Sequence, residues 1–238
     1  MIAPRQLFQE GRLGEAIDAL GAELRSDPTD APRRTFLFEL LCFAGEWDRA
    51  EKQLDVLGQS SEDAARGTLL YRSALHAERT RQQLFTTGNL PLAPTDPAPV
   101  AGTLNGDPFG ALTDADSRIG ARLELFAAGQ YTLLPWAHVA SVTIEAPKKL
   151  RDLLWIPAVV RTGPAFKGYE LGEVLLPALA AASNQHANEA VRLGRLTVWE
   201  GSDHDGPVPF GQKLLLVDDE EFPILEVRAL EIAGADHP

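Results

Sequence analysis

An internal repeat constrains the N-terminal fold of this chain more than any other sequence feature. The stretch that begins at Gly11 matches the stretch that begins at Gly45, an offset of 34 residues, which is the period of a tetratricopeptide repeat. Each glycine fits the tight turn between paired helices, and Ala16 and Ala50 are small enough to let the next helix approach closely. Such a repeat stacks with its neighbours and leaves a concave surface that commonly holds a segment of another protein. The repeat therefore favours a binding protein over an enzyme.

Turn signals divide the first part of the chain into helices. Residues 3–86 are expected to be helical, with breaks at Gly11, Asp27-Pro28, Gly45 and residues 58–60. Ser61 is a candidate cap for a last helix that runs to about Phe85. The positions expected to be buried on that helix are Leu69, Leu70, Leu75 and Leu84.

A proline-rich stretch separates this helical part from the rest of the chain. Pro91, Pro94, Pro97 and Pro99 forbid a continued helix and favour an extended connector. The runs that favour strands after it are 130–134, 139–145, 153–161, 171–176, 196–200, 213–217 and 224–232. Glycine, proline and aspartate clusters separate most of these runs, which is typical of antiparallel strands joined by turns.

These patterns together predict an α+β chain. A tetratricopeptide-like helical domain is expected over residues 1–88, a connector over 89–104 and a mainly antiparallel β domain over 105–238. The pattern leaves open whether the β domain closes into a barrel. It also leaves open whether residues 178–192 form a helix or a long loop.

Composition narrows the choice of partner and compartment. The chain has 238 residues and a formal net charge of −12, most of which falls in its second part. An acidic surface repels phosphate backbones, so nucleic acid and anionic membranes are poor partners and a basic protein segment is a better one. Cys42 is the only cysteine, which excludes an intrachain disulfide. Neither a signal peptide nor an apolar membrane-spanning run is evident, so we expect a cytoplasmic protein.

Several phrases of the second part recur together in one known family. They are Asn105-Gly106-Asp107-Pro108-Phe109, Thr113-Asp114-Ala115-Asp116-Ser117-Arg118, Leu150-Arg151-Asp152-Leu153-Leu154-Trp155 and Gly194-Arg195-Leu196-Thr197-Val198-Trp199. In this order, the phrases resemble the ImpE/TagJ family, also called SciE-type proteins, which are accessory components of bacterial type VI secretion systems. Phrases in the helical part agree, so the resemblance spans nearly the whole chain.

The resemblance implies an adaptor without catalytic chemistry or a cofactor. It implies a partner in the contractile sheath, namely the N-terminal helix of the small sheath subunit TssB. The ClpV ATPase, which recycles the sheath, acts on the same structure, so an indirect link to ClpV is also implied. The implied role is modulation of sheath assembly or of ClpV-dependent recycling.

The residues that carry this resemblance also allow a chemical interpretation. Asp107, Asp114 and Asp116 offer carboxylates for a divalent cation, but the residue spacing of a calcium-binding loop is absent. The preferred interpretation is that these side chains, with help from Ser117, brace a turn. Arg118, Arg151 and Asp152 suit structural ion pairs better than a catalytic cluster. A metal-dependent enzyme with a site around Asp114, Asp116, Arg118 and Arg151 is kept as an alternative. The stretch Ser202-Asp203-His204-Asp205 contains hydrolase-like residue types, but no nucleophile elbow accompanies it.

Inner helices of a repeat stack line its groove, which defines the candidate partner site. Arg33, Arg34, Phe38 and Leu41 are the expected contacts, with core positions as the alternative for Phe38 and Leu41. Trp47 and Tyr71 would add aromatic contact area if they are exposed. Trp136 and Trp155 of the β domain are alternative anchors. Self-association through the acidic β domain is a further hypothesis.

Overall fold

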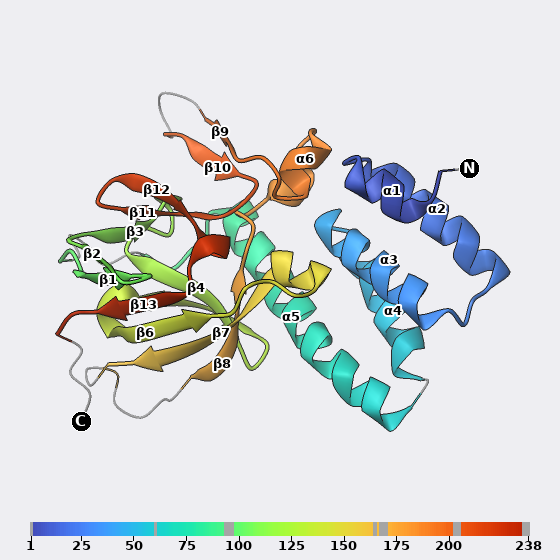
Figure 1. The fold of residues 1–238 in the computed structure, drawn as a ribbon, viewed down its shortest axis with the longest axis horizontal. Helices are drawn as coiled ribbons and strands as arrows, with labels where there is room; N and C mark the ends of the chain where they lie inside the picture. Colours follow the sequence, from blue (N-terminus) through green and yellow to red (C-terminus); the bar gives the residue numbers. More distant parts are fainter. Residues whose placement is uncertain are drawn as a thin grey trace.

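The structure is a computed structural model that describes residues 2–59, 61–92, 98–163, 166, 171–201 and 206–234. Its first part is a stack of antiparallel helices followed by one long helix. The helices are α1 (Pro4–Gln9), α2 (Leu13–Ser26), α3 (Ala31–Phe43), α4 (Trp47–Gly58) and α5 (Glu62–Thr87). Figure 1 shows α5 running between the other four helices and the β-sheet. Tetratricopeptide-like helices and antiparallel strands are therefore both present, as the sequence predicts.

Local sequence explains where these helices begin and end. Asp30 caps α3 by accepting a hydrogen bond from the amide of Arg33 at 2.8 Å, and Ser61 caps α5 through the amide of Ala64. Gly11 and Gly45 both adopt left-handed backbone conformations, with φ of 81° and 72°. Because only glycine reaches this region without strain, the two matching glycines end α1 and α3 with the same tight turn.

The second part is built from antiparallel strands that do not close into a barrel. Among the described residues, eight strands form one sheet in the order β2-β1-β13-β6-β7-β8-β4-β5, and two smaller sheets have the orders β12-β11-β3 and β10-β9. The strands of the large sheet are β1 (Gly102–Leu104), β2 (Asp107–Phe109), β4 (Arg122–Ala127), β5 (Gln130–Pro135), β6 (Val139–Ile144), β7 (Trp155–Thr162), β8 (Gly172–Pro177) and β13 (Ala229–Ile232). The smaller sheets contain β3 (Leu112–Asp114), β9 (Val198–Glu200), β10 (Val208–Phe210), β11 (Leu214–Val217) and β12 (Glu220–Pro223). The large sheet is open because its end strands, β2 and β5, are not paired to each other.

Two details differ from the sequence-based expectation. Strand β1 occupies residues expected to belong to the connector, and it pairs with β13 from the far end of the chain. The segment 178–192 is neither one helix nor one loop, because it contains a 3-10 turn (Ser183–Gln185) and the short helix α6 (Glu189–Arg192). The connector residues 93–97 and the stretch Ser202–Asp205 lie outside the described residues.

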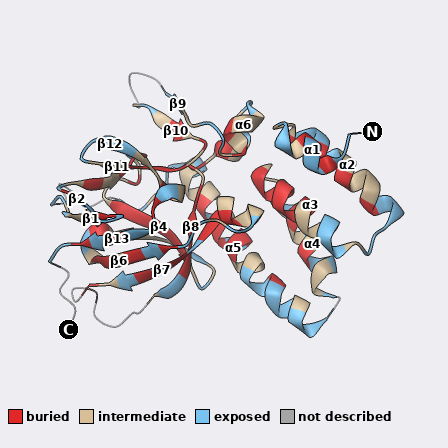
Figure 2. Cartoon of the chain, viewed as in Figure 1, coloured by how far each residue is buried: buried red, intermediate tan, exposed pale blue. Residues whose placement is uncertain are grey.

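Two apolar cores hold the fold, and one of them is shared by both parts. The β core lies inside the large sheet and includes Leu125, Trp136 and Ile156. The other core fills the helical stack but also takes in Phe126, Leu154 and Trp155 from the β part. In Figure 2, α3 is buried in its second half, from Leu37 to Phe43, whereas α5 carries exposed residues in its first half. Within the described residues, no helix is long and apolar enough to cross a membrane.

Candidate functional site

The concave side of the helical stack is filled by the chain itself. Phe38 is 1% exposed and lies 6.0 Å from the ring of Tyr71 and 6.4 Å from that of Trp155. Leu41 is fully buried in the same core. The expectation that Phe38 and Leu41 line an open groove is therefore wrong, because the β part supplies the apolar surface on which they pack. Trp136 and Trp155 are equally buried, so they are core residues rather than partner anchors.

A 3-10 turn formed by Leu150–Leu153 lies between the β part and the helices (Figure 1, yellow). Arg151 lies 3.4 Å from a carboxylate oxygen of Glu39 on α3, and its guanidinium stacks over the ring of Tyr71 at 4.7 Å. The next residue, Asp152, accepts hydrogen bonds from the amides of Lys148 and Lys149, both at 2.9 Å. Burial raises the pKa of Glu39, although Arg151 opposes the shift. Arg151 thus joins the two parts through an ion pair and a stacking contact, whereas Asp152 caps the turn within the β part.

The segment around α6 binds the ends of three helices of the repeat. Glu189 accepts hydrogen bonds from the amides of Leu13 and Gly14 at the start of α2, both at 2.8 Å. Arg192 donates to the carbonyl of Ala44 behind α3, and Arg195 donates to the carbonyls of Phe8 and Gln9 at the end of α1. An acidic side chain thus meets a helix N-terminus, and basic side chains meet helix C-termini, as the helix dipole favours. The closeness of the contact is clear at Gly45, where a Cβ atom would lie 2.0 Å from Nδ2 of Asn184.

A buried network of charged side chains crosses the same boundary. Arg81 on α5 donates to both carboxylate oxygens of Glu124 on β4, at 2.8 and 3.0 Å, and it also pairs with Glu78. Lys213 forms ion pairs with Glu124 and Asp114, and Tyr131 donates to Glu124 at 2.7 Å. All four charged partners Arg81, Glu124, Asp114 and Lys213 are almost completely inaccessible to solvent. Buried charges of this kind must be paired and hydrogen-bonded, since water cannot solvate them.

Burial and charge pairing shift the pKa values of two carboxyl groups in this network, Asp114 and Glu124, in opposite directions. Burial raises the pKa of Asp114 to about 6, because the attraction of Lys213 offsets the loss of solvation only in part. Burial also opposes ionisation of Glu124, but Arg81 and Lys213 together outweigh it and hold the pKa of that carboxyl well below its usual value. Lys213 keeps its charge, because its two carboxylate partners raise its pKa despite its burial.

The remaining residues of the family phrases brace turns or fill the core. Asp116 accepts hydrogen bonds from the amide of Arg118 and from its guanidinium, the shortest at 2.6 Å, so that the pair closes the turn after β3. Ser117 in this turn is exposed. On β2, Asp107 and Pro108 are exposed, while Phe109 is buried in the β core.

Of the residues kept for an enzyme site, the structure holds Asp114, Asp116 and Arg118 in one turn but separates Arg151 from them. Asp114 pairs with Lys213 and Asp116 with Arg118, whereas Arg151 contacts Glu39 and Tyr71 on the helices. In the part of the chain that the structure describes, no three His, Cys, Asp or Glu side chains are arranged to hold a metal ion. Cys42 is buried among apolar residues, and burial raises the pKa of its thiol well above the usual value.

The polar partner candidates on the helices are engaged in local contacts. Arg33 bridges Glu23 and Asp30, and Arg34 donates to Gln53 at 2.7 Å and to the carbonyl of Pro28. Trp47 is half-buried at the start of α4, where it packs against the shared core. Tyr71 is also half-buried, but it borders an open groove that the sequence analysis did not find.

This groove has a volume of about 560 Å³ and lies between α5 and the outer face of the large sheet. One wall is formed by Leu70, Tyr71, Ser73 and Ala74 of α5, and the turn at Ala128-Gly129 closes one side. The floor consists of Phe126, Trp155, Pro157, Ala158, Val159, Glu173, Val174 and Leu175, and the far rim consists of Thr143, Glu145, Ala146, Lys148 and Asp152. We call this feature the α5–sheet groove.

Strand register places the apolar Val159 of the groove floor between two polar neighbours. Val159 on β7 lies opposite Thr143 on β6 and Glu173 on β8, while Pro157 lies opposite Leu175. Outward positions of an antiparallel sheet are usually polar, because this face meets water. Here Val159 is 38% exposed and Leu70 on the opposite wall is 52% exposed. Outward apolar positions on β7 and the apolar Leu70 were therefore the available sequence signal. The expectation that Leu69 and Leu70 are buried is wrong.

The architecture is a tetratricopeptide-type helical stack that shares its core with an open antiparallel sheet. Residues 106–231 match the family model described as ImpE protein, and residues 7–72 match a tetratricopeptide repeat model. The chain therefore belongs to the ImpE family.

Individual relatives agree along the whole length. The chain is 34% identical over 269 residues to the type VI secretion system accessory component TagJ of Pseudomonas aeruginosa, with 99% of this chain and 92% of that protein covered. Its fold is also similar to the crystal structure of a protein from Vibrio parahaemolyticus, with a TM-score of 0.83, 22% identity and 97% of each chain covered.

Proposed function

We propose that this protein is an accessory component of a type VI secretion system that acts by binding another protein rather than by catalysis. The observation that carries the proposal is the relationship to TagJ, which extends over 99% of the chain and therefore includes both the helical stack and the sheet. Helical repeats of this class serve mainly as binding scaffolds. Asp114, Asp116, Arg151 and Asp152 of the family phrases also have structural partners, which is compatible with a scaffold.

The partner we propose is the N-terminal helix of the small sheath subunit TssB, and the role is modulation of sheath assembly or of ClpV-dependent recycling. A helix is a suitable ligand for a repeat protein, because it buries its apolar face in a groove while its own backbone stays hydrogen-bonded. The net charge of −12 further favours a partner segment that carries basic side chains. We also propose a cytoplasmic location for this chain, which its sequence favours.

Calorimetric titration of the full chain with a peptide that covers this helix tests the proposal. We expect saturable one-to-one binding with a Kd in the micromolar range or tighter, about −8 kcal/mol or more favourable. A peptide of the same composition with its apolar residues moved off one helical face is the matched control, and it should bind far more weakly. Equal binding of the two peptides, or no binding of either, would contradict the proposed partner.

A further inference from the structure

We propose that His186 is a pH-sensitive latch: its neutral ring holds the α6 segment, residues 188–195, on the helical repeat, and a second proton on the ring releases that segment. The α6 segment binds the ends of three repeat helices through Glu189, Arg192 and Arg195. His186 lies just before it and directly follows the 3-10 turn Ser183–Gln185. The latch acts on the junction of the two parts, so it does not depend on which partner the chain binds.

Hydrogen bonds at both ring nitrogens define where His186 carries its proton. Nδ1 lies 3.0 Å from the backbone amide of Asn188, which can only donate, so Nδ1 accepts and carries no proton. Nε2 lies 2.9 Å from a carboxylate oxygen of Glu200, so it carries the proton that this oxygen accepts. The ring is therefore neutral and held in one tautomer, and its side chain is only 13% exposed.

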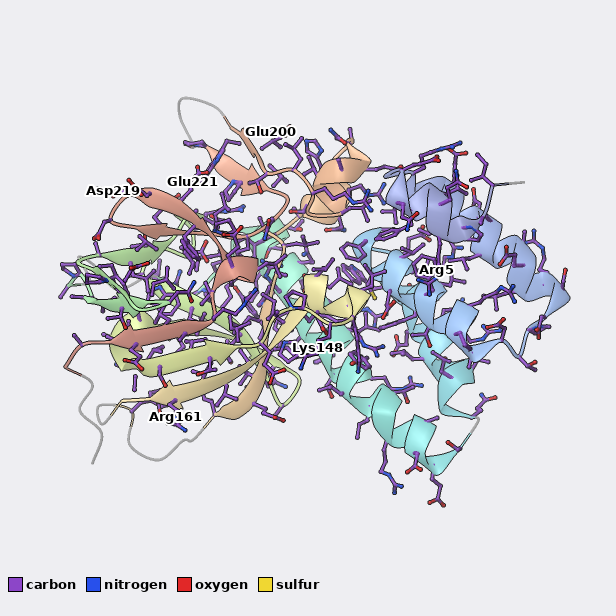
Figure 3. All side chains as sticks on the ribbon, viewed as in Figure 1. Arg5, Lys148, Arg161, Glu200, Asp219 and Glu221 are labelled. Carbon is purple, nitrogen blue, oxygen red and sulfur yellow. The ribbon has the colours of Figure 1, made fainter. Side chains whose placement is uncertain are left out.

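The same ring joins the β9–β10 hairpin to the start of α6. Glu200 lies at the end of β9 (Figure 3), and the ring of Phe210 on β10 lies 5.8 Å from the imidazole. On the other side, Asn188 is the N-cap of α6, because its side chain accepts a hydrogen bond from the amide of Ala190 at 2.9 Å. The next residue, Glu189, caps α2. The bond between the ring and Asn188 therefore fixes the residue at which the contact with the repeat begins.

A second proton disrupts the hydrogen bonds of the ring on one side only. It can bind only at Nδ1, where it meets the N–H of Asn188, so two donors replace a hydrogen bond. At Nε2 the bond to Glu200 gains a second charge, and a charge-assisted bond is roughly twice as strong as a neutral one. The charged ring therefore stays with the hairpin and releases α6. Imidazole is the side chain that ordinarily titrates between about pH 5 and 8.

The other charged groups around the ring are engaged elsewhere. On the described elements that surround it, β10 and the 3-10 turn carry no charged side chain, and α6 carries Glu189 and Arg192. Glu189 accepts hydrogen bonds from the amides of Leu13 and Gly14, and Arg192 donates to the carbonyl of Ala44. Among these charged groups, the carboxylate on β9 is therefore the one that bonds to the ring.

Amide hydrogen exchange of the full chain tests the latch. Exchange rates are measured by NMR at about pH 7.5 and about pH 5.5 and corrected for the intrinsic pH dependence of exchange. We expect the protection of the amides of Leu13, Gly14 and Ala190 to fall about fivefold at the lower pH, as for the loss of one hydrogen bond. The nitrogen chemical shifts of the His186 ring should show an unprotonated Nδ1 at about pH 7.5.

His186→Asn is the variant that separates the ring from other titrating groups. Asparagine accepts a hydrogen bond from the amide two residues further on, as in an Asx turn, so it keeps the bond to Asn188 at either pH. Asp114, with a pKa of about 6, still titrates in this variant. We expect protection that no longer differs between the two pH values. The control is His76→Gln at an exposed position on α5, which should behave like the unchanged chain.

Equal protection of these amides at the two pH values in the unchanged chain would overturn the latch. A proton on Nδ1 at about pH 7.5 would overturn it as well, because the ring could then not accept from Asn188. A fall in protection that persists in His186→Asn would assign the pH dependence to another group, with the same consequence.

Discussion

Arg81 is the side chain whose loss should most damage the junction between the helices and the sheet. Its guanidinium donates to Glu124 at 2.8 and 3.0 Å, to Glu78 at 3.2 Å and to the carbonyl of Leu179 at 3.0 Å. Arg81→Met keeps most of the side-chain volume, but it removes the positive charge that pairs with the buried carboxylates of Glu78 and Glu124. Breaking a buried ion pair in this way costs about 3–5 kcal/mol, and the lost hydrogen bond to the carbonyl adds about 1 kcal/mol.

The expected loss of about 4–6 kcal/mol is a large share of the roughly 5–15 kcal/mol that stabilises a typical protein. Urea unfolding followed by circular dichroism measures this loss, which should appear as a lower urea concentration at the midpoint of unfolding. For a chain of this length the melting temperature should fall by roughly 8–24 °C. The control is Arg49→Met, because Arg49 pairs with Glu46 on the surface of α4 and should contribute no more than about 1 kcal/mol.

A double variant separates charge imbalance from lost packing. Arg81→Met combined with Glu124→Gln removes one charge of each sign, so it should be more stable than Arg81→Met alone. Lys213 retains Asp114 as a partner in that background. A loss below about 1 kcal/mol for Arg81→Met, equal to that of the surface control, would refute the role of the buried network.

Two further predictions concern the same boundary. Gly45→Ala should lower the free energy of unfolding by about 1–3 kcal/mol more than Gly11→Ala, because both glycines have positive φ but only at position 45 does the new methyl overlap Asn184. Adding Asn184→Ala should recover most of this difference in urea unfolding, since it removes the two closest atoms and leaves only the Cβ of residue 184 at 3.1 Å. Asp114 has a pKa of about 6 in the folded chain, so as the pH falls the native state takes up a proton at a higher pH than the unfolded state does. The free energy of unfolding of the unchanged chain, relative to that of Asp114→Asn, should therefore rise by up to about 3 kcal/mol as the pH falls from about 6 to about 4. A relative stability that stays flat or falls over this pH range would contradict the raised pKa.

The helical part could be predicted from sequence because its signals are local. Gly11 and Gly45 mark turns that depend only on the backbone of a few residues, and Ser61 and Asp30 cap helices through amides three residues away. Most of the longer strands were found for the same reason. Strand β4 was missed, because its sequence Arg-Leu-Glu-Leu-Phe-Ala contains good helix formers and its assignment depends on pairing with β5 and β8.

The candidate site could not be predicted because long-range packing creates it. Helical periodicity did not find the buried side of α5, because Leu69 and Leu70 are exposed. The buried side carries Leu75 together with the charged Glu78 and Arg81. The buried network joins Arg81 with Glu124, 43 residues away, and Glu124 with Lys213, 89 residues away. No local pattern connects such positions, so only the fold reveals that their charges compensate one another.

The repeats and the sheet have to be treated as one binding unit. The sheet part supplies the apolar surface for Phe38, Glu189 caps α2, and Arg195 binds the end of α1, so the repeat is completed by residues far along the chain. The α5–sheet groove also needs both parts, since its wall comes from α5 and its floor from β7 and β8. An isolated helical segment would expose the shared core and would lack the groove floor. Each part therefore depends on the other for its folded state, because neither part alone covers the shared core.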